Sequence, residues 1–420
     1  MWGRFLIFTL LLQLPVGVTG QVKDTVRISM QEVFSEVDKT HPSLRFYQSK
    51  IAAVHSLVEG AKAWMPPMAI LSLDRFSYRF SMMKEKTPDN QAGIMLSVQQ
   101  MIPNAAKLNA KRDYLVSLEN VQRNDWEWQK NVLHFAAKLY YYRRYIAEKK
   151  LNIIREYREL LQLLLKTAKE KYTYNQADLP TIFKAEASQG ELNNMEAMLL
   201  SQANEGNIGL NTLMNHDVNT TFSIDTLLVL KDYSIGYLQD LDSSGLLRND
   251  ILAVDSRIRS MKFSRIWVAT SSKPDFGIQV SHGQMFGMPN QFSVMGMITI
   301  PVVPWSSKMY KSEVSSMGFE IEAMQMEKAT MQLMVRQMIR EKIVMLLYEK
   351  KQLDGYDNTV LPAYHRNFET SLVAYRQNTG SFFVLLDAWN MLLMKELERM
   401  DKLGQVFTIQ SEYEYQKEIK

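Results

Sequence analysis

The sequence predicts a mainly α-helical protein with a small membrane β-barrel portion. Three observations lead to this fold class. Apolar residues recur every three or four positions through two very long segments, which is the period of a coiled coil. They alternate with polar residues through four segments of about ten residues, the length of a tilted transmembrane strand. The same order of segments also occurs twice along the chain, which indicates two internal structural repeats.

The N-terminus is predicted to direct export of the chain. A basic start, Met1-Trp2-Gly3-Arg4, precedes the apolar run FLIFTLLLQLPVGVTG. Residues 1–20 therefore have the pattern of a secretory signal peptide that is cleaved after Gly20. An uncleaved anchor helix is the alternative, but Pro15 and Gly17 interrupt the run before it reaches the ~20 residues needed to span a membrane.

Composition excludes several classes of protein. The chain has 420 residues, 46% of them hydrophobic, a formal net charge of +4 and no cysteine. No block of Lys and Arg is interleaved with aromatic residues, so nucleic-acid binding is not expected. Without cysteine, the chain has neither disulfides nor a thiol-linked lipid anchor. No segment after the signal peptide offers about 18 consecutive apolar residues, so any contact with a membrane must be made by strands.

Short sequence matches divide the mature chain into repeats at 21–215 and 216–420. Each match joins two positions roughly 200 residues apart, in the same order along both halves. The matched pairs are YNQ from Tyr174 with YRQ from Tyr375, MIPN from Met101 with TIPVVPW from Thr299, and SLRF from Ser43 with GLLRND from Gly245.

Each repeat is predicted to contain a helix, a pair of strands, a very long helix and a return helix. The first helix breaks at His41-Pro42, because proline disfavours helical geometry in the residue before it. The long helices span roughly 70 residues and are on the order of 100 Å long, which suits a rod or a tube. The approximate ranges are 29–64, 72–102, 104–174 and 180–215 in the first repeat and 247–270, 275–300, 306–378 and 381–416 in the second.

Methionines recur every seven residues in the second long helix, from Met317 to Met345. Thioethers suit soft ions such as Cu(I). However, neighbours in the series lie about 10 Å apart, whereas metal–sulfur bonds are near ~2.3 Å long. A strict heptad keeps one stripe of a helix against its neighbour, so we expect a buried coiled-coil seam here and no metal site.

The predicted strands each have one apolar face. In DRFSYRFSMM, which begins at Asp74, aromatic residues alternate with arginine and serine. A soluble sheet packed on a core would give the same alternation. The strand length, the exported chain and the arginines favour a barrel with a water-filled lumen. The residues predicted to face this lumen are Arg75, Arg79, Gln99 and Gln279.

A barrel built from these strands must be shared between copies of the chain. Four strands cannot close a barrel, and an open sheet edge in lipid leaves backbone groups without hydrogen bonds. Strand count alone permits a dimer, a trimer or a tetramer. A lumen wide enough for solutes disfavours the smallest of these.

The pattern resembles the TolC family of outer-membrane efflux proteins over nearly the whole mature chain, with the heavy-metal branch of that family as one candidate placement. HPSLRFYQSKIAAV from His41 resembles the family's N-P-x-L-x-x-A motif. QMIPNAAKLNAKRDYL and ITIPVVPWSSKMYKSE resemble its paired strand-to-helix signature, I-P-L-F. The turns that begin at Tyr174 and Tyr375 resemble the two ends of the family's helical tube.

The resemblance implies a homotrimer. Such a trimer has a 12-stranded barrel, four strands per chain, in the outer membrane of a Gram-negative bacterium. A long coiled-coil tube of twelve helices continues it into the periplasm. The implied function is a passive exit duct for a tripartite efflux pump, in which a periplasmic adaptor protein and an inner-membrane transporter deliver the substrate. An exit channel for type I secretion is the alternative within the family.

The resemblance also implies a gate at the periplasmic tip. Asp387 matches one tip aspartate of the family and Tyr375 matches a tyrosine that takes part in closure. Three such carboxylates around a threefold axis would attract cations, although Asp387 could equally be a solvated residue of the return helix. The chain departs from the family where members carry charged tip residues, and Asp178 and Arg376 could substitute for them. The departures are at Thr181, Gly380 and Val384.

The residues give no support for an enzyme, a cofactor or a metal site. The six histidines form no H-E-x-x-H motif and no pair at helical ligand spacing. The chain has no G-x-S-x-G motif and no glycine-rich phosphate loop. The competing class is a secreted coiled-coil scaffold or pump adaptor without a barrel, which would be freely soluble in the periplasm.

Overall fold

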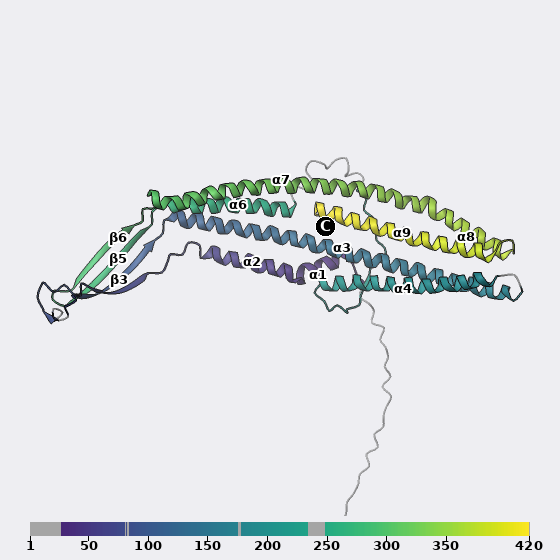
Figure 1. Cartoon of the computed structure of the whole chain (residues 1–420), viewed down its shortest axis with the longest axis horizontal. Helices are drawn as coiled ribbons and strands as arrows, with labels where there is room; N and C mark the ends of the chain where they lie inside the picture. Colours follow the sequence, from purple (N-terminus) through teal and green to yellow (C-terminus); the bar gives the residue numbers. More distant parts are fainter. Residues whose placement is uncertain (1–26, 80, 82–83, 175–177, 234–247, 420) are drawn as a thin grey trace, which may run out of the picture.

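The computed structural model describes residues 27–79, 81, 84–174, 178–233 and 248–419. The chain forms an elongated, gently bowed body with a β-sheet at one end and two helix-to-helix turns at the other (Figure 1). Its C-terminus lies near the middle of the long axis. The predicted signal peptide, residues 80 and 82–83 of the first predicted strand, and parts of the YNQ and GLLRND matches lie outside the described residues.

The helices of the first half begin at polar caps. The Ser29 side chain accepts a hydrogen bond from the Glu32 amide, and Asn104 does the same for the Ala106 amide. The first helix breaks at His41 as predicted, but its second part ends before Gly60 rather than near residue 64. The bounds are α1 Met30–Thr40, α2 Pro42–Glu59, α3 Ala105–Tyr172 and α4 Leu179–Leu213.

The second half has the same order of helices, with one interruption that the sequence analysis did not predict. The long helix expected over 306–378 contains a π-helical turn just before Pro362. Proline has no amide hydrogen and its ring collides with the carbonyl four residues earlier, so it disrupts a regular helix. The bounds are α6 Asn249–Ala269, η2 Thr270–Ser272, α7 Pro304–Gly355, η3 Tyr356–Val360, α8 Leu361–Arg376 and α9 Phe382–Lys417.

Four antiparallel strands form the main sheet in the order β2-β3-β5-β6. The central pair, β3 with β5, joins the two halves of the chain. β2 and β6 are the two edges. The bounds are β2 Met68–Asp74, β3 Gly93–Ile102, β5 Phe276–Met285 and β6 Gln291–Ile298. A second, small parallel pair joins β1 Arg27–Ile28 to β4 Ser223–Ile224.

The first strand lies earlier in the chain than predicted. Its ladder with β3 ends at the pair Asp74 and Gly93. Arg75 then adopts a φ of 52°, a left-handed conformation that ends an extended strand. Arg75 and Arg79 therefore lie in the connection between β2 and β3, and their assignment to a strand was wrong. The alternation after Asp74 is real, but the register with the neighbouring strand decides which residues form the ladder.

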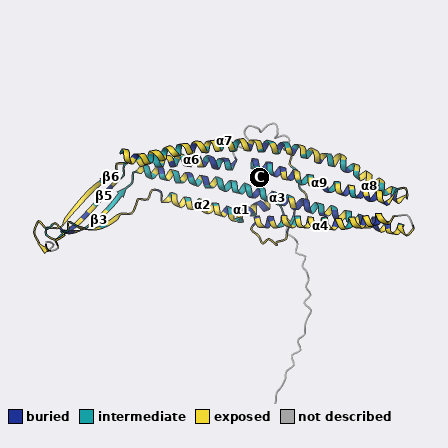
Figure 2. Cartoon of the chain, in the orientation of Figure 1, coloured by how far each residue is buried: buried dark blue, intermediate teal, exposed yellow. Residues whose placement is uncertain are grey.

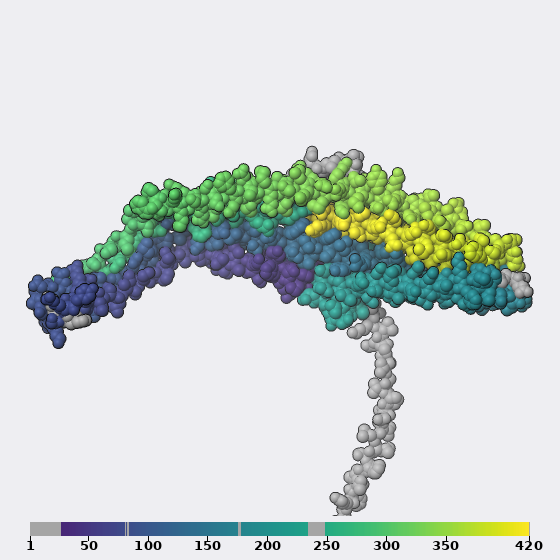
Figure 3. Space-filling view, viewed as in Figure 1, coloured from purple at the N-terminus to yellow at the C-terminus, as the bar shows by residue number. Residues whose placement is uncertain are grey.

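The helices between the sheet and the middle of the molecule form a single layer. α3 packs between α2 and α6, and α6 packs against α7. α2 and α7 are therefore the two edges of the layer, as the space-filling view shows (Figure 3). α7 is exposed along most of its length (Figure 2).

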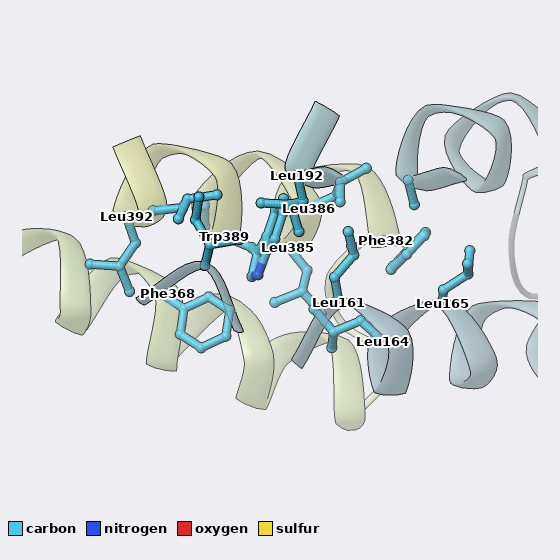
Figure 4. Close-up of a cluster of buried hydrophobic side chains, with 14 of the residues drawn as sticks. Leu161, Leu164, Leu165, Leu192, Phe368, Phe382, Leu385, Leu386, Trp389 and Leu392 are labelled. Atoms are coloured by element: carbon cyan, nitrogen blue, oxygen red, sulfur yellow. The ribbon is translucent and has the colours of Figure 1, made fainter. Parts of the chain in front are cut away.

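Toward the tip, α3, α4, α8 and α9 share one hydrophobic core (Figure 4). In this core, leucines of α3 face apolar residues of α9, and α4 and α8 each add side chains beside them. The residues are Leu161, Leu164 and Leu165 of α3, Leu385, Leu386 and Trp389 of α9, Leu192 of α4 and Phe368 of α8. Because leucine recurs at helical spacing in each segment, these positions fall on one face of each helix. None of the described helices combines the length and apolarity needed to cross a bilayer.

The methionine series of α7 is largely a packing seam. Met324, Met331 and Met338 are half-buried and pack against the apolar residues that α6 and α7 share. Met345, in contrast, is 44% exposed. The seam prediction is therefore confirmed for the middle of the series and wrong for its last member. Met345 lies outside the cluster that Ile251, near the start of α6, forms with Ile343 of α7.

Candidate functional site

One face of the sheet is mainly apolar and exposed along all four strands, with Gln100, His282 and Gln284 as its polar members. Leu71 on β2 is 73% exposed and Phe292 on β6 is 80% exposed. A continuous apolar surface of this kind is unusual for a soluble monomer and indicates contact with lipid or with another protein. The large apolar residues on this face are Leu71, Leu73, Ile94, Leu96, Val98, Phe276, Ile278, Val280, Phe292, Val294 and Ile298.

The opposite face is more buried and carries polar side chains at its centre. The hydroxyl groups of Ser97 and Ser281 lie 2.8 Å apart and are hydrogen-bonded. Gln99 and Gln279, two of the predicted lumen residues, are direct partners in the register of β3 and β5. Both share this face with the serines because side chains alternate along a strand.

The two arginines predicted to line a lumen do not belong to this face. Arg75 Nη1 donates a hydrogen bond to Gln91 Oε1 at 2.5 Å. The Arg79 amide donates to Ser77 Oγ at 3.2 Å. Both residues lie in the connection beyond the end of the ladder, so the polar character of the sheet comes from serine and glutamine.

At the other end of the molecule, a lysine joins the two helix-to-helix turns. Lys171 Nζ, in the last turn of α3, donates to the Tyr375 carbonyl at 2.9 Å and to Asn378 Oδ1 at 2.6 Å. The same ammonium group lies 4.2 Å from the centre of the Tyr375 ring. Lys171 thereby ties the end of α8 to the end of α3, since a cation is favoured at helix C-termini and over aromatic faces.

Tyr375 is a buried residue of this tip. Its ring is 3% exposed and packs against Phe382, the first residue of α9. Burial raises the pKa of the Tyr375 hydroxyl above its usual value. Among the described residues, no group forms a hydrogen bond with this hydroxyl.

Asp178 caps α4. Its carboxylate accepts hydrogen bonds from the Thr181 amide at 3.0 Å and from the Thr181 hydroxyl at 2.5 Å. These hydrogen bonds hold the pKa of Asp178 below its usual value. Thr181 therefore serves as the partner of Asp178 within this turn.

Arg376 and Asp387 are exposed. Within the part of the chain that the structure describes, neither side chain forms an ion pair or a hydrogen bond. Asp178, engaged with Thr181, does not pair with Arg376 in the single chain. The charged residues predicted for the tip are thus brought to one end of the molecule without forming an intramolecular lock.

Solved structures of outer-membrane proteins are similar to this fold over most of the chain. VceC from Vibrio cholerae is 11% identical, with a TM-score of 0.73, over 92% of this chain and 95% of that one. The CmeC channel of Campylobacter jejuni is 14% identical, with a TM-score of 0.71, over 92% and 85%. CusC is 11% identical, with a TM-score of 0.74, over 93% and 92%. The chain has the TolC-channel fold. No protein-family model and no curated protein matches the sequence.

Two features of this TolC-channel fold were not predicted from the sequence. One is Lys171. It could have been recognised as a basic residue in the last turn of a long helix, where a cation is favoured. The other is a set of methionines on the polar face of the sheet, which could be recognised only after the strand register was known.

Proposed function

We propose that the chain is one protomer of a trimeric outer-membrane exit channel. The observation that carries this proposal is the sheet, which combines an exposed apolar face with a central polar face and two open edges. Lipid would cover the apolar face, and closure of the edges would turn the polar face toward a lumen. The TolC-channel fold of the chain supports the same arrangement.

Closure would pair β2 of one copy with β6 of the next. Both edges carry large apolar residues on the exposed face, including Leu73 on β2 and Val294 on β6. Three copies would supply twelve strands. The exposed side of α7, an edge of the helical layer, would similarly pack against a neighbouring copy and extend the channel into a periplasmic tube.

The exit channel would act passively within a tripartite efflux pump. The helical tip, far from the sheet, is the natural contact for a periplasmic adaptor and an inner-membrane transporter, which would supply the substrate. The outer membrane of a Gram-negative bacterium would be its location. A duct for type I secretion would use the same channel with a different transporter.

Engineered disulfides test the closure of the barrel directly, because the natural chain has no cysteine. Ser72→Cys on β2 and Ser293→Cys on β6 lie on the polar face at opposite edges of the sheet. The register between copies is unknown, so each cysteine on β2, at Ser72 or Ile70, is paired in turn with each cysteine on β6, at Ser293 or Met295. We expect at least one combination to give a covalent trimer in intact outer membranes, measured by non-reducing electrophoresis.

The control is Ser97→Cys with Ser281→Cys, whose side chains already meet within one chain. This pair should form a disulfide without any covalent oligomer. If every edge combination stays monomeric while the control pair oxidises, the shared barrel is refuted. A wild-type protein that is freely soluble in the periplasm without detergent would favour a scaffold or adaptor instead.

A substitution at the tip tests the expected cation-attracting gate. Asp387→Ala would remove three carboxylates from the tip of a trimer. Because each unit charge contributes about 1 kcal/mol at contact distance in water, we expect block by divalent cations to weaken by about tenfold or more. The measurement is single-channel conductance with cations added from the periplasmic side. Glu322→Ala, an exposed carboxylate of α7, is the control, and equal block in both variants would remove Asp387 from the gate.

A further inference from the structure

The methionines of the sheet all lie on its polar face. Six methionines fall within the four strands, and the register places every one of them on the face of Gln99 and Gln279. The large apolar residues of the exposed face are leucine, isoleucine, valine and phenylalanine instead, and Gln100, His282 and Gln284 are its polar members. The methionines are thus gathered on the face that also carries Gly93, Gly277 and Gly283. The six are Met68, Met95, Met101, Met285, Met295 and Met297.

Two of these methionines meet above a glycine at the helix-proximal end of the sheet. Gly277 on β5 is flanked in register by Met101 on β3 and Met297 on β6. A Cβ atom at Gly277 would lie 2.7 Å from Met101 Sδ and 3.0 Å from Met297 Cε. The two side chains therefore lean from both neighbouring strands into the space that the missing Cβ leaves. Gln99 Nε2 donates to Met101 Sδ at 3.6 Å, which helps to hold this thioether in place.

A second notch lies at the far end of the same face and holds Met285. Met95 is the register partner of Gly283, and Met285 Sδ lies 3.5 Å from where a Cβ of Gly283 would be. The same sulfur would be 2.8 Å from a Cβ at Gly93. Glycine at these positions thus leaves two notches. Met101 and Met297 occupy the first, and Met285 occupies the second, with Met95 as its diagonal neighbour in the register of β3 and β5.

The chemistry of the face points to a soft cation. A thioether is a neutral, polarisable ligand that favours Cu(I) and similar ions, whereas Mg²⁺ and Ca²⁺ require carboxylate or carbonyl oxygens. Asp74, at the end of β2, is the single carboxylate on this face among the described strand residues. The amides and hydroxyls between the pairs would keep the path hydrated without adding charge.

We propose that the pairs Met101 with Met297 and Met95 with Met285 bind soft monovalent cations, Cu(I) or Ag(I), as these ions pass along the sheet. This inference rests on the proposed channel, because the polar face becomes a lumen only when the barrel closes. A trimer would carry three copies of each pair around the lumen. Weak sites of this kind, repeated along a path, allow an ion to enter and to leave.

The test is Ag(I) binding to the purified, detergent-solubilised full-length protein, measured by isothermal titration calorimetry. Met101→Leu with Met297→Leu should abolish one Ag(I) site per protomer, and adding Met95→Leu with Met285→Leu should abolish a second. Leucine retains the volume of methionine, so the fold should survive, and size-exclusion chromatography checks it. The single variant Met101→Leu is a milder substitution that should still weaken Ag(I) binding at the first pair.

The matched control is Met326→Leu with Met334→Leu, two exposed methionines of α7. This control should bind as much Ag(I) as the wild type, and Mg²⁺ should not compete. Equal Ag(I) binding by the fourfold sheet variant and the wild type would overturn the proposal. Metal-free conductance separates the two inferences. If the wild type forms pores and the fourfold variant binds as much Ag(I) as the wild type, the metal sites are refuted and the channel is not. If the fourfold variant loses Ag(I) binding but the wild type forms no pores, the channel is refuted and the Ag(I) sites are not.

Discussion

Val98→Arg is expected to prevent the protein from assembling in the outer membrane. Val98 lies in the middle of β3, on the exposed apolar face, with Val280 of β5 opposite. An arginine facing lipid near the midplane of the bilayer costs about 2–4 kcal/mol, and a trimer would bear this cost three times. The amount of trimer in outer-membrane fractions, compared with total protein, measures the effect.

The neighbouring residue provides the control. Gln99→Arg places the same side chain one position further along β3 but on the polar face, where a hydrated lumen would accept it. We expect this variant to assemble normally and to change only conductance or ion selectivity. If both variants assemble equally well, the apolar face does not contact lipid.

Glu414→Gln is expected to destabilise the middle of the molecule strongly. Glu414 on α9 is 1% exposed, and its carboxylate lies 2.6 Å from Lys138 Nζ on α3. Its other oxygen accepts from the Tyr233 hydroxyl at 2.6 Å and lies 3.2 Å from Lys231 Nζ. Removing one partner of a buried ion pair costs about 3–5 kcal/mol, because the remaining charge is left without compensation. Denaturant unfolding of the detergent-solubilised protein measures the loss.

Two further variants show whether the loss of stability comes from the buried ion pair or from replacing any paired carboxylate. Adding Lys138→Met to Glu414→Gln removes the uncompensated ammonium group and should recover much of the loss. Glu119→Gln breaks an ion pair with Arg123, which is 59% exposed, and should cost less than about 1 kcal/mol. A loss in Glu414→Gln no larger than that in Glu119→Gln would contradict a structural role for the buried network.

The network also predicts sensitivity to acid. Burial by itself would raise the pKa of Glu414, but hydrogen bonds from Lys138 and Tyr233 and the charges of Lys138 and Lys231 hold it below its usual value of 4.5. A carboxylate with a lowered folded-state pKa stabilises the fold above its unfolded-state pKa and ceases to do so as the pH falls through the folded-state value. The wild type should therefore lose stability below about pH 4.5 more steeply than Glu414→Gln.

Much of the architecture was predictable because its signals are local. A sustained period defines each long helix. Asn104 also caps the start of α3, whereas α7 begins after Val303 without a side-chain cap. The faces of β3 and β5 were also predicted, because Gln99 and Gln279 alternate with apolar neighbours in the sequence itself. The prediction that the first strand extends over Arg75 and Arg79 was wrong. Alternation indicates which residues share a face, but it does not indicate where the hydrogen-bonded ladder ends.

The sequence by itself determined the long helices, the order of the elements and the two-faced character of the strands, since each depends on periodicity within one segment. Only the tertiary structure decided which distant side chains meet. Lys138 and Glu414 are separated by 276 residues, and Met101 and Met297 come from strands on either side of Gly277. The physical reason is that pairing register and helix packing bring such groups together, and neither leaves a periodic signal in the local sequence. The methionine series of α7, conspicuous in the sequence, is mainly packing, whereas the methionines gathered by the sheet were invisible until the strands were aligned.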